Sequence, residues 1–274
     1  MRQKPKSIGI ISKCNTPEII KTTGDIIGFL KNKVDIVGHP ATARRFKLRS
    51  QSIEEMQTDM IVCIGGDGTI LKTLQSMEKE IPILGINMGA MGFLAGATPE
   101  RALPAVQRTL KGFKIEERIR LAVHLNGEDL PYATNEAVIL TSRPAKLMHF
   151  KIKVDGDELA TLRADGVVFA TPTGSTAYAM SAGGPIVDPR VDAIIIVPLA
   201  PFTLLAKPIV VSAASTITVD RLNEKESTLV IDGHFARKLK RKDEMVVEKA
   251  DRPAQFVKTE DTFFSKVRSK LMEK

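Results

Sequence analysis

Residues 1–118 alternate short, continuous apolar runs with stretches that have helical spacing. The runs predicted as strands lie at 7–11, 34–38, 59–65 and 82–87, and the predicted helices lie at 17–32, 69–77 and 99–112. Continuous apolar strands that alternate with helices are typical of a parallel sheet whose two faces are both covered. The sequence therefore predicts a doubly wound α/β domain over residues 1–118.

Residues 119–251 have a different pattern of apolar and polar residues, with little helical spacing. Their short β-branched runs are separated by Gly, Asp, Asn or Pro, which is typical of an antiparallel sheet or sandwich. The pairs Asn126-Gly127 and Asp155-Gly156 indicate hairpin turns, because these residue types accept the positive φ that such turns need. We predict a β-sandwich domain over 119–251. The tail returns to helical spacing, so we expect residues 252–274 to join the first domain through a helix that packs on the body of the protein.

The chain of 274 residues carries a net charge of +8, which favours anionic ligands. Its aromatic content is 5%, and it has no zinc-finger spacing, arginine-rich arm or RNA-binding aromatic motif. Phosphorylated small molecules therefore fit the charge better than nucleic acid. We also expect no membrane association, because no apolar run reaches the ~18 residues of a membrane helix. The N-terminus lacks a secretory pattern and the two cysteines lie far apart, so we expect a cytoplasmic protein.

Residues 65–69 read GGDGT and follow directly on the predicted strand 59–65. Glycine backbone at the carboxyl end of a parallel strand lets amide groups approach a phosphate, and the next helix presents its positive end there. The spacing matches neither a P-loop nor a dinucleotide-binding Rossmann loop. The alternative is a tight turn in which Asp67 and Thr69 cap the helix.

Residues 85–95, GINMGAMGFLA, are a second glycine-rich exit from a strand. A reversal of strand order between the two glycine-rich exits would create a crevice of the kind in which α/β sheets bind ligands. The alternative is a glycine-rich loop that packs under the second domain.

Residues 163–187, RADGVVFATPTGSTAYAMSAGGPIV, concentrate hydroxyl groups on flexible backbone and suit a polar ligand such as a nucleoside. A plain Ser/Thr-rich loop is the alternative, and Asp165-Gly166 is either a turn or a carboxylate aimed at an amide or hydroxyl. Asn135 and Glu136 begin an apolar strand, where an amide and a carboxylate suit ribose hydroxyls or a base edge, although a solvated strand end is the more common arrangement.

The remaining polar patterns do not indicate a catalytic or metal-binding site. Five basic residues lie within 237–242, and we expect the segment 234–242 that contains them to form a solvated β-turn. The four histidines have no zinc-site spacing, and no Gly-x-Ser-x-Gly motif supports a serine hydrolase.

Taken together, these motifs resemble the NAD kinase family. The matching segments occur in the family's order and spacing: GGDGT (65–69), NMGAMGFL (87–94), NE (135–136), DGVVFATPTGSTAYAMSAGGPI (165–186) and DG (232–233). The first segment alone is similar to loops of phosphofructokinases and lipid kinases, whereas the long segment 165–186 distinguishes the families.

The resemblance implies an N-terminal α/β domain, a C-terminal β-sandwich and a site between them. The implied reaction phosphorylates the 2′-hydroxyl on the adenosine ribose of NAD to give NADP, with ATP or polyphosphate as donor. Mg²⁺ or another divalent cation is expected through the donor phosphates, without an assigned protein ligand. The implied ligands are NAD(H) and NADP(H), and the implied assembly is a homodimer or homotetramer in which neighbours help complete the dinucleotide pocket.

The resemblance also implies roles for single residues. Asp67 corresponds to the family's general base, Asn135 and Glu136 would hold the adenosine end of NAD, and Asp165 would face the nicotinamide end. The residues expected to border the phosphoryl donor are Gly65, Gly66, Gly68 and Thr69. The other residues expected to contact NAD are Gly68, Phe93 beside the adenine, Thr173, Thr176, Ala177, Tyr178 and Ser181. The chain departs from the family at Lys207, where Arg is common, and the roles of Lys207 and His234 stay open.

The implied chemistry agrees with the residues, because a ribose hydroxyl is a poor nucleophile and an aligned carboxylate can accept its proton during phosphoryl transfer. Three other functions remain open at this stage: a kinase for a lipid or sugar, a dinucleotide sensor without catalysis, and a nucleic-acid binder. The hydroxyl-rich segment speaks against the first of these and Asp67 against the second.

Overall fold

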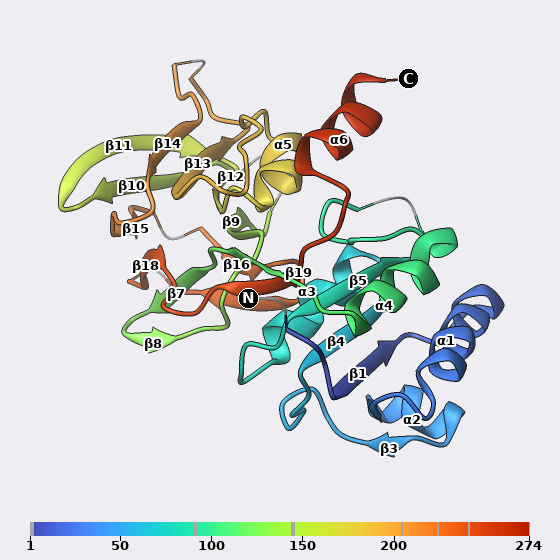
Figure 1. Cartoon of the computed structure of the whole chain (residues 1–274). Coiled ribbons are helices and arrows are strands. Elements are labelled where there is room, and N and C mark those ends of the chain that lie inside the picture. The colour runs from blue at the N-terminus through green and yellow to red at the C-terminus, as the bar shows by residue number, and fades with distance from the viewer. Residues whose placement is uncertain are drawn as a thin grey trace. The chain divides into compact units, whose positions relative to one another are not determined.

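The computed structural model describes residues 3–89, 92–143, 146–203, 205–223, 225–240 and 242–273 (Figure 1). They form two compact units, which are described separately. The first unit contains Met1–Glu117 and Ala254–Lys274, and the second unit contains Arg118–Pro253.

Within the described residues, the first unit holds a seven-stranded sheet in the order β3-β2-β1-β4-β5-β19-β6. Its elements in chain order are β1 (Ser7–Ser12), α1 (Pro17–Leu30), β2 (Asp35–Gly38), α2 (Pro40–Phe46), β3 (Arg49–Ser50), β4 (Met60–Gly65), α3 (Asp67–Ser76), β5 (Ile83–Asn87), η1 (Pro99–Arg101), α4 (Ala102–Leu110), β6 (Ile115–Arg118), β19 (Ala254–Val257), α6 (Phe263–Val267) and η3 (Arg268–Met272). The neighbours β2, β1, β4, β5 and β19 pair in parallel.

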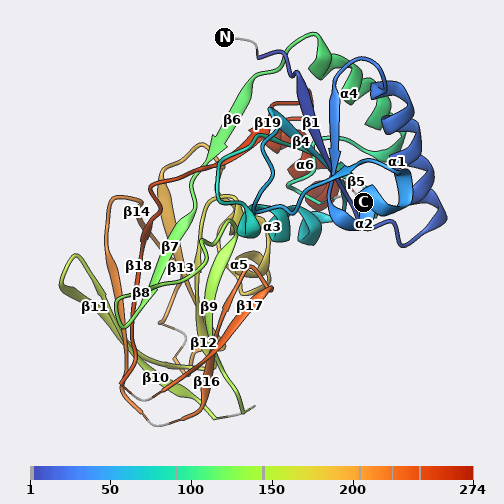
Figure 2. The same cartoon turned by 90° about the horizontal axis from the view of Figure 1, so that it is seen from below.

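Strand β4 shows why this sheet is covered on both faces. Met60, Val62 and Ile64 pack with α1 and α4, which lie side by side in Figure 2. Ile61 and Cys63 point to the opposite face and pack with α3. A strand without a polar face can be buried only between two layers of helices, so the predicted doubly wound α/β fold is confirmed.

The reversal of strand order that would form a crevice does not lie between the two glycine-rich exits. The reversal lies between β1 and β4, because β2 and β3 extend the sheet on one side of β1 and β4 and β5 extend it on the other. Strands β4 and β5 are direct neighbours, with Gly65 paired to Asn87. The backbone N–H of Met88 donates to Gly65 O at 3.2 Å, so the two glycine-rich exits still lie beside each other at one edge of the sheet.

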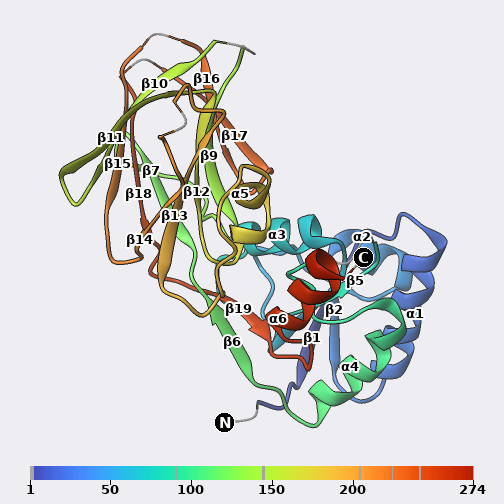
Figure 3. The same cartoon turned by 90° about the horizontal axis from the view of Figure 1, so that it is seen from above.

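The second unit is a sandwich of two antiparallel sheets, each with six strands among the described residues (Figure 3). One sheet, in spatial order, contains β11 (Asp157–Ala164), β10 (Met148–Val154), β15 (Ile217–Arg221), β18 (Glu244–Lys249), β7 (Leu121–Leu125) and β8 (Glu128–Asp129). The other contains β14 (Ile209–Ser212), β13 (Ala193–Leu199), β12 (Gly166–Ala170), β9 (Glu136–Thr141), β16 (Ser227–Ile231) and β17 (Phe235–Leu239).

The two sheets share one apolar core, in which Phe150 and Ile152 of the first sheet pack with Val167 and Phe169 of the second. The outer face of β12 is also covered, because Val168 and Ala170 pack with the short helix α5 (Tyr178–Ser181). The hydroxyl-rich segment after β12 therefore folds back over its own sheet. The predicted sandwich and the returning C-terminal helix are both confirmed.

Both predicted hairpin turns are confirmed. Asn126 and Gly127 join β7 to β8 with φ of 54° and 78°, and Asp155 and Gly156 join β10 to β11 with φ of 54° and 90°. Two successive positive φ values match the right-handed twist of the flanking strands.

The β-turn expected over 234–242 is confirmed only in its last part. Phe235–Leu239 forms strand β17 and pairs with β16, and the turn into β18 follows it, where the N–H of Asp243 donates to Lys240 O at 3.2 Å. Another turn lies before β17, at Asp232 and Gly233, where φ is 48° and 68°. Leu239 is buried and Phe235 packs on the sandwich core, so the basic residues between them obscured a strand with period two.

No helix in the described part of the chain is long and apolar enough to span a membrane.

Candidate active site

The GGDGT segment turns the chain from β4 into α3. Gly66 is the residue before the helix, and its carbonyl accepts hydrogen bonds from the N–H groups of Thr69 (2.9 Å) and Ile70 (3.4 Å). Helix α3 begins at Asp67, so the side chains of Asp67 and Thr69 lie inside the first turn. The alternative in which they cap the helix is therefore wrong, and the positive end of α3 faces the glycine backbone.

The carboxylate of Asp67 reaches from the β4 exit to the β5 exit. Its Oδ2 accepts hydrogen bonds from the backbone N–H groups of Phe93 (2.8 Å) and Leu94 (3.3 Å). Its Oδ1 is buried and has no hydrogen-bond partner among the described residues. A Cβ on Gly92 would lie 1.8 Å from Oδ1, so only glycine leaves room for this carboxylate. The site thus fixes one carboxylate oxygen and leaves the other for a ligand.

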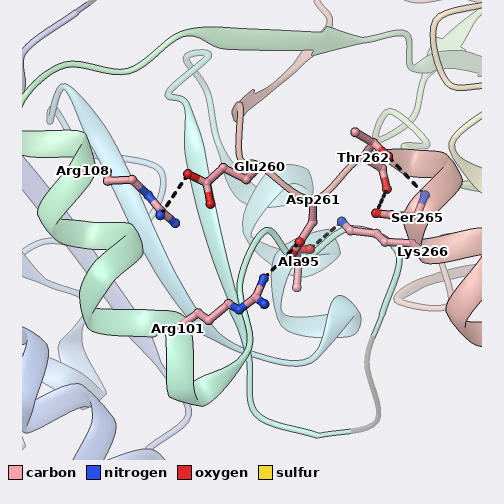
Figure 4. Close-up of polar contacts among 8 residues, drawn as sticks. All are labelled: Ala95, Arg101, Arg108, Glu260, Asp261, Thr262, Ser265 and Lys266. Atoms are coloured by element: carbon pink, nitrogen blue, oxygen red, sulfur yellow. Dashed lines mark hydrogen bonds and ion pairs between the residues drawn. The ribbon is translucent and has the colours of Figure 1, made fainter.

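The C-terminal helix adds two lysines that the sequence analysis did not identify. Lys266, which is buried, donates from Nζ to the carbonyls of Ala95 (2.7 Å) and Phe93 (3.1 Å), and the first of these bonds is drawn in Figure 4. Nζ of Lys270 lies 4.2 Å from the centre of the Phe93 ring. Burial lowers the pKa of Lys270, and the negative charge of Asp67 opposes this shift. The signal in the sequence was the spacing of two lysines four residues apart on a predicted helix.

In the second unit, Asp232 holds the backbone of the Asn135-Glu136 pair. Its Oδ1 accepts from the N–H groups of Asn135 (2.8 Å) and Glu136 (3.0 Å), and its Oδ2 accepts from Thr134 (2.7 Å). The N–H of Asp232 donates in return to Glu136 O at 3.0 Å. In the sequence, Asp232-Gly233 was only a segment that matches the NAD kinase family, without a role for Asp232, so this role was also missed.

The side chains of Asn135 and Glu136 are buried, and each keeps an oxygen without a hydrogen-bond partner in the described residues: Asn135 Oδ1 and Glu136 Oε2. Burial raises the pKa of Glu136 to about 8, with a further contribution from the negative charge of Asp232. Burial also raises the pKa of Asp232, but its three amide donors oppose that shift. Because Asp232 has these donors, it is the member of the pair that ionises first. The expectation of a solvated strand end at Asn135 is therefore wrong.

The hydroxyl-rich segment packs against this pair. The N–H of Thr171 donates to Asn135 O (2.9 Å), and the Thr171 hydroxyl donates to Thr134 O (2.6 Å). A Cβ on Gly174 would lie 2.0 Å from Asn135 O, so glycine is required for this approach. The backbone N–H of Tyr178 donates to the Glu136 carboxylate, and this hydrogen bond acts to lower the pKa of Glu136. The structure thereby brings Asn135, Glu136 and the segment after β12 to one place.

The expected NAD-contacting residues of this segment differ in exposure. Thr173 and Thr176 are buried, and the Thr173 hydroxyl has no partner within the described chain. Tyr178 and Ser181 are exposed, and Ala177 lies between the two groups at the start of α5. The segment is anchored through Ser175, whose hydroxyl accepts from the N–H of Val187 (3.0 Å) and donates to its carbonyl (3.2 Å). The segment is therefore packed and anchored in its first half, which differs from the alternative of a plain Ser/Thr-rich surface loop.

Models of two protein families match most of the chain. The ATP-NAD kinase N-terminal domain matches residues 8–113, and the ATP-NAD kinase C-terminal domain matches residues 134–259. The chain belongs to the NAD kinase family.

Full-length relatives agree with this assignment. The chain is 47% identical over 273 residues to the NAD kinase of Methanothermobacter thermautotrophicus, covering 97% of this chain and 96% of the relative. It is 44% identical over 271 residues to the NAD kinase of Methanosarcina acetivorans, covering 97% and 98%. As a member of the NAD kinase family, the chain is a phosphotransferase with an alcohol group as acceptor.

Solved structures of the family share the fold. A yeast NADH kinase in complex with NADH has a TM-score of 0.90 at 26% identity, covering 98% of this chain and 88% of the yeast chain. An NAD kinase from Archaeoglobus fulgidus in complex with ATP has a TM-score of 0.81 at 34% identity, covering 96% and 99%.

One residue expected from the NAD kinase family resemblance lies apart from the others. Asp165 precedes β12, whereas Thr171 and Thr173 follow it, and the six residue steps of extended chain from Asp165 to Thr171 span about 20 Å. The backbone of Asp165 is fixed by Leu199 O, which accepts from its N–H at 2.9 Å, and by the N–H of Thr141, which donates to its carbonyl at 2.8 Å. Its Oδ1 is buried and has no partner in the described segments. Within one copy of the chain, Asp165 is therefore not part of the group around Asn135 and Glu136.

Lys207, where the NAD kinase family commonly has Arg, is exposed on the second unit. Across the described residues, no cluster of three or more His, Cys, Asp or Glu side chains has the arrangement of a metal site.

Proposed function

We propose that the chain transfers a phosphoryl group from ATP to the 2′-hydroxyl on the adenosine ribose of NAD, giving NADP. The observation that carries the proposal is the carboxylate of Asp67, which is fixed through Oδ2 and has Oδ1 without a hydrogen-bond partner among the described residues. Relatives named NAD kinase at 44% and 47% identity support the acceptor, and the relative solved with ATP supports the donor. Polyphosphate remains the second candidate donor.

The donor phosphates would lie against the GGDGT segment. Gly66 has open space where a side chain would be, and the N-terminal end of α3 offers a positive dipole. We propose that the backbone of Gly65, Gly66 and Gly68 borders the phosphates, together with the Thr69 hydroxyl, which is buried without a partner in the described chain. Lys270 is a further positive group beside Asp67.

A divalent cation fits this place because Thr69 Oγ1 is a buried oxygen without a hydrogen-bond partner among the described residues, and Mg²⁺ prefers oxygen ligands. We propose that Mg²⁺ is held chiefly by the donor phosphates, with Asp67 as the protein carboxylate nearest to them. When bound, Mg²⁺ neutralises phosphate charge and so reduces the repulsion between the donor and Asp67.

The chain's own residues then hold the catalytic carboxylate and accept a proton. The amides of Phe93 and Leu94 hold Asp67 Oδ2, so that Oδ1 accepts the proton of the ribose hydroxyl as its oxygen attacks the terminal phosphorus. The bond from that phosphorus to the bridging oxygen of the donor breaks, and ADP leaves. Because phosphoryl transfer passes through a loose, in-line transition state, positioning and charge neutralisation carry most of the catalysis.

NAD would be held by the second unit. Asn135 Oδ1, Glu136 Oε2 and the Thr173 hydroxyl are buried polar atoms that lack partners within the described residues, and ribose hydroxyls or a base edge would supply them. We propose that the adenosine end lies against Asn135 and Glu136, with Thr176, Ala177, Tyr178 and Ser181 along its side. Phe93 of the first unit would lie beside the adenine.

Asp165 requires a different arrangement, because about 20 Å of strand separates it from Thr171 in the same copy. We propose that the chain assembles as a homodimer or homotetramer, and that Asp165 of a second copy faces the nicotinamide end of the bound NAD.

The proposal is tested by turnover of purified protein with NAD or NADH as acceptor and Mg-ATP or polyphosphate as donor. We expect NAD and ATP to give a product that an NADP-specific dehydrogenase reduces and that NMR identifies as the 2′-phosphate. A product phosphorylated at another hydroxyl, or turnover of a lipid or sugar instead of NAD, would contradict it. Tight NAD binding without turnover would indicate a sensor.

A further inference from the structure

The C-terminal helix contacts the same loop that holds Asp67. The loop 93–95 donates its N–H groups at Phe93 and Leu94 to Asp67 Oδ2, and it offers its carbonyls at Phe93 and Ala95 to Lys266 Nζ. The Phe93–Leu94 peptide group is shared, since its carbonyl accepts from Lys266 at 3.1 Å and its N–H donates to Asp67 at 3.3 Å. One peptide group therefore lies between a cation and an anion.

Such an arrangement strengthens both hydrogen bonds. An ammonium group on the carbonyl side polarises the peptide and makes its N–H a better donor, and a carboxylate on the N–H side acts in the same direction. Lys266 is only 8% exposed. Burying an ammonium group is unfavourable unless it is hydrogen bonded, so packing alone would favour an apolar side chain here. The two carbonyls that Lys266 orients give a reason for a charged side chain at this buried position.

The tail that carries Lys266 is fixed to the first unit (Figure 4). Arg101 and Arg108 on η1 and α4 pair with Asp261 at 3.4 Å and Glu260 at 3.1 Å. The Thr262 hydroxyl then caps α6 by accepting from the N–H of Ser265 at 3.1 Å. These contacts set where α6 begins, and so where Lys266 meets the loop.

We infer that Lys266 is a positioning residue for the phosphoryl transfer. It fixes the loop 93–95 so that the amides of Phe93 and Leu94 hold Asp67 Oδ2, which aims Oδ1 at the acceptor hydroxyl. The inference rests on the proposed function, and it makes the C-terminal helix a working part of the catalytic unit.

The test is a double-mutant cycle on the full-length protein with NAD and Mg-ATP. Lys266→Met is expected to lower kcat at least tenfold, with KM for NAD and for ATP changed less than threefold. In a background of Asp67→Asn, the same substitution is expected to lower the residual kcat less than twofold, because the carboxylate that it positions is already gone. Equal losses in both backgrounds, or a kcat of Lys266→Met within twofold of wild type, would overturn the inference.

The control is Arg268→Met, which removes a cation from the same helix where the side chain is exposed and pairs with Glu273 at 3.2 Å. We expect its kcat and both KM values to stay within twofold of wild type. If Lys266→Met does not fold, Lys266→Gln carries the same cycle, since it keeps a neutral donor. A loss of at least threefold that disappears in the Asp67→Asn background supports the inference, and a loss that persists there overturns it.

A second readout separates this inference from the proposed function. Hydrogen exchange at the amides of Phe93 and Leu94 is expected to be at least tenfold faster in Lys266→Met than in wild type, whether or not the protein phosphorylates NAD. A wild-type protein without NAD turnover would contradict the proposed function alone. Unchanged exchange at these two amides would overturn the role of Lys266.

Discussion

The backbone N–H of Phe93 donates a 2.8 Å hydrogen bond to Asp67 Oδ2, which ties the loop after β5 to the first turn of α3. The two residues are 26 positions apart in the sequence, yet their strands are neighbours and end at the same edge of the sheet. The two glycine-rich segments thus form one structure, in which one strand exit supplies the carboxylate and the other supplies its donors.

This relationship predicts a strict requirement for glycine at position 92. In Gly92→Ala the new Cβ would lie 1.8 Å from Asp67 Oδ1 and 2.0 Å from Cγ, so the carboxylate must move. We expect kcat to fall roughly 10²-fold, since a misplaced catalytic group loses its alignment. The matched control is Gly89→Ala in the same loop, where a Cβ would meet nothing within 4 Å, and it should keep kcat within about threefold. Steady-state kinetics of the two variants test this requirement, and equal kcat values for Gly92→Ala and Gly89→Ala would contradict it.

The fold could be predicted to a large extent from local sequence. Strand β4 is apolar at every position and must be buried on both faces, and Asn126-Gly127 and Asp155-Gly156 have the positive φ that their turns need. Strand β17 was missed because Arg237 and Lys238 obscure the alternation of Phe235 and Leu239. Strand order was missed because it depends on which edge of β1 each strand joins, and local pattern does not encode that choice.

The site residues were predictable as residue types, but their partners were not. Asp67, Asn135 and Glu136 stand out because polar side chains follow or begin apolar strands. The groups that orient them lie far away in sequence: Lys266 is 173 positions from Phe93, and Asp232 is 97 positions from Asn135. Such contacts exist only after the tail has returned to the loop 93–95 and the β16–β17 turn has returned to the start of β9, so no local spacing predicts them.

The backbone conformation around Asn135 is expected to depend on Asp232. Its two oxygens accept from three N–H groups, whereas in Asp232→Asn one oxygen is replaced by an NH₂ group that faces a donor. We expect a loss of about 2–4 kcal/mol in unfolding free energy, because buried donors lose a charged acceptor. KM for NAD should rise at least tenfold.

The control for this prediction is Asp220→Asn, which removes a partly exposed ion pair with Lys153 at 3.4 Å and should change stability by less than ~1 kcal/mol. Urea denaturation and NAD titration measure both effects. A variant Asp232→Asn as stable as Asp220→Asn would contradict the role assigned to Asp232.

Glu136 predicts a pH dependence of stability. Its pKa is raised to about 8 in the folded protein from an ordinary value of 4.5. Between these values the folded state binds more protons than the unfolded state, so this contribution is complete below about pH 4.5 and is lost as the pH rises to about 8. Compared with Glu136→Gln, which does not titrate, wild type should lose stability on the order of a few kcal/mol between pH 5 and pH 8.5. Urea denaturation at several pH values measures the difference, and parallel curves for the two proteins would contradict it.

Asp165 predicts complementation between copies of the chain. Asp67→Asn and Asp165→Asn should each be nearly inactive alone, since each site needs Asp67 of one copy and Asp165 of another. If the two variants are unfolded together and refolded as a random mixture of dimers, activity should return to about a quarter of wild type, because half of the dimers regain one of two symmetric sites. Activity no higher than that of the separate variants would place Asp165 in the site of its own copy.

Asp67 is central to the proposed mechanism as the group that accepts the proton of the ribose hydroxyl. The direct measurement is kcat for NADP formation from NAD and Mg-ATP in Asp67→Asn, with folding checked by thermal unfolding. We expect kcat to fall by roughly 10²–10⁴-fold, the usual contribution of a general base, while the protein stays folded. A folded Asp67→Asn variant with kcat within tenfold of wild type would contradict the mechanism.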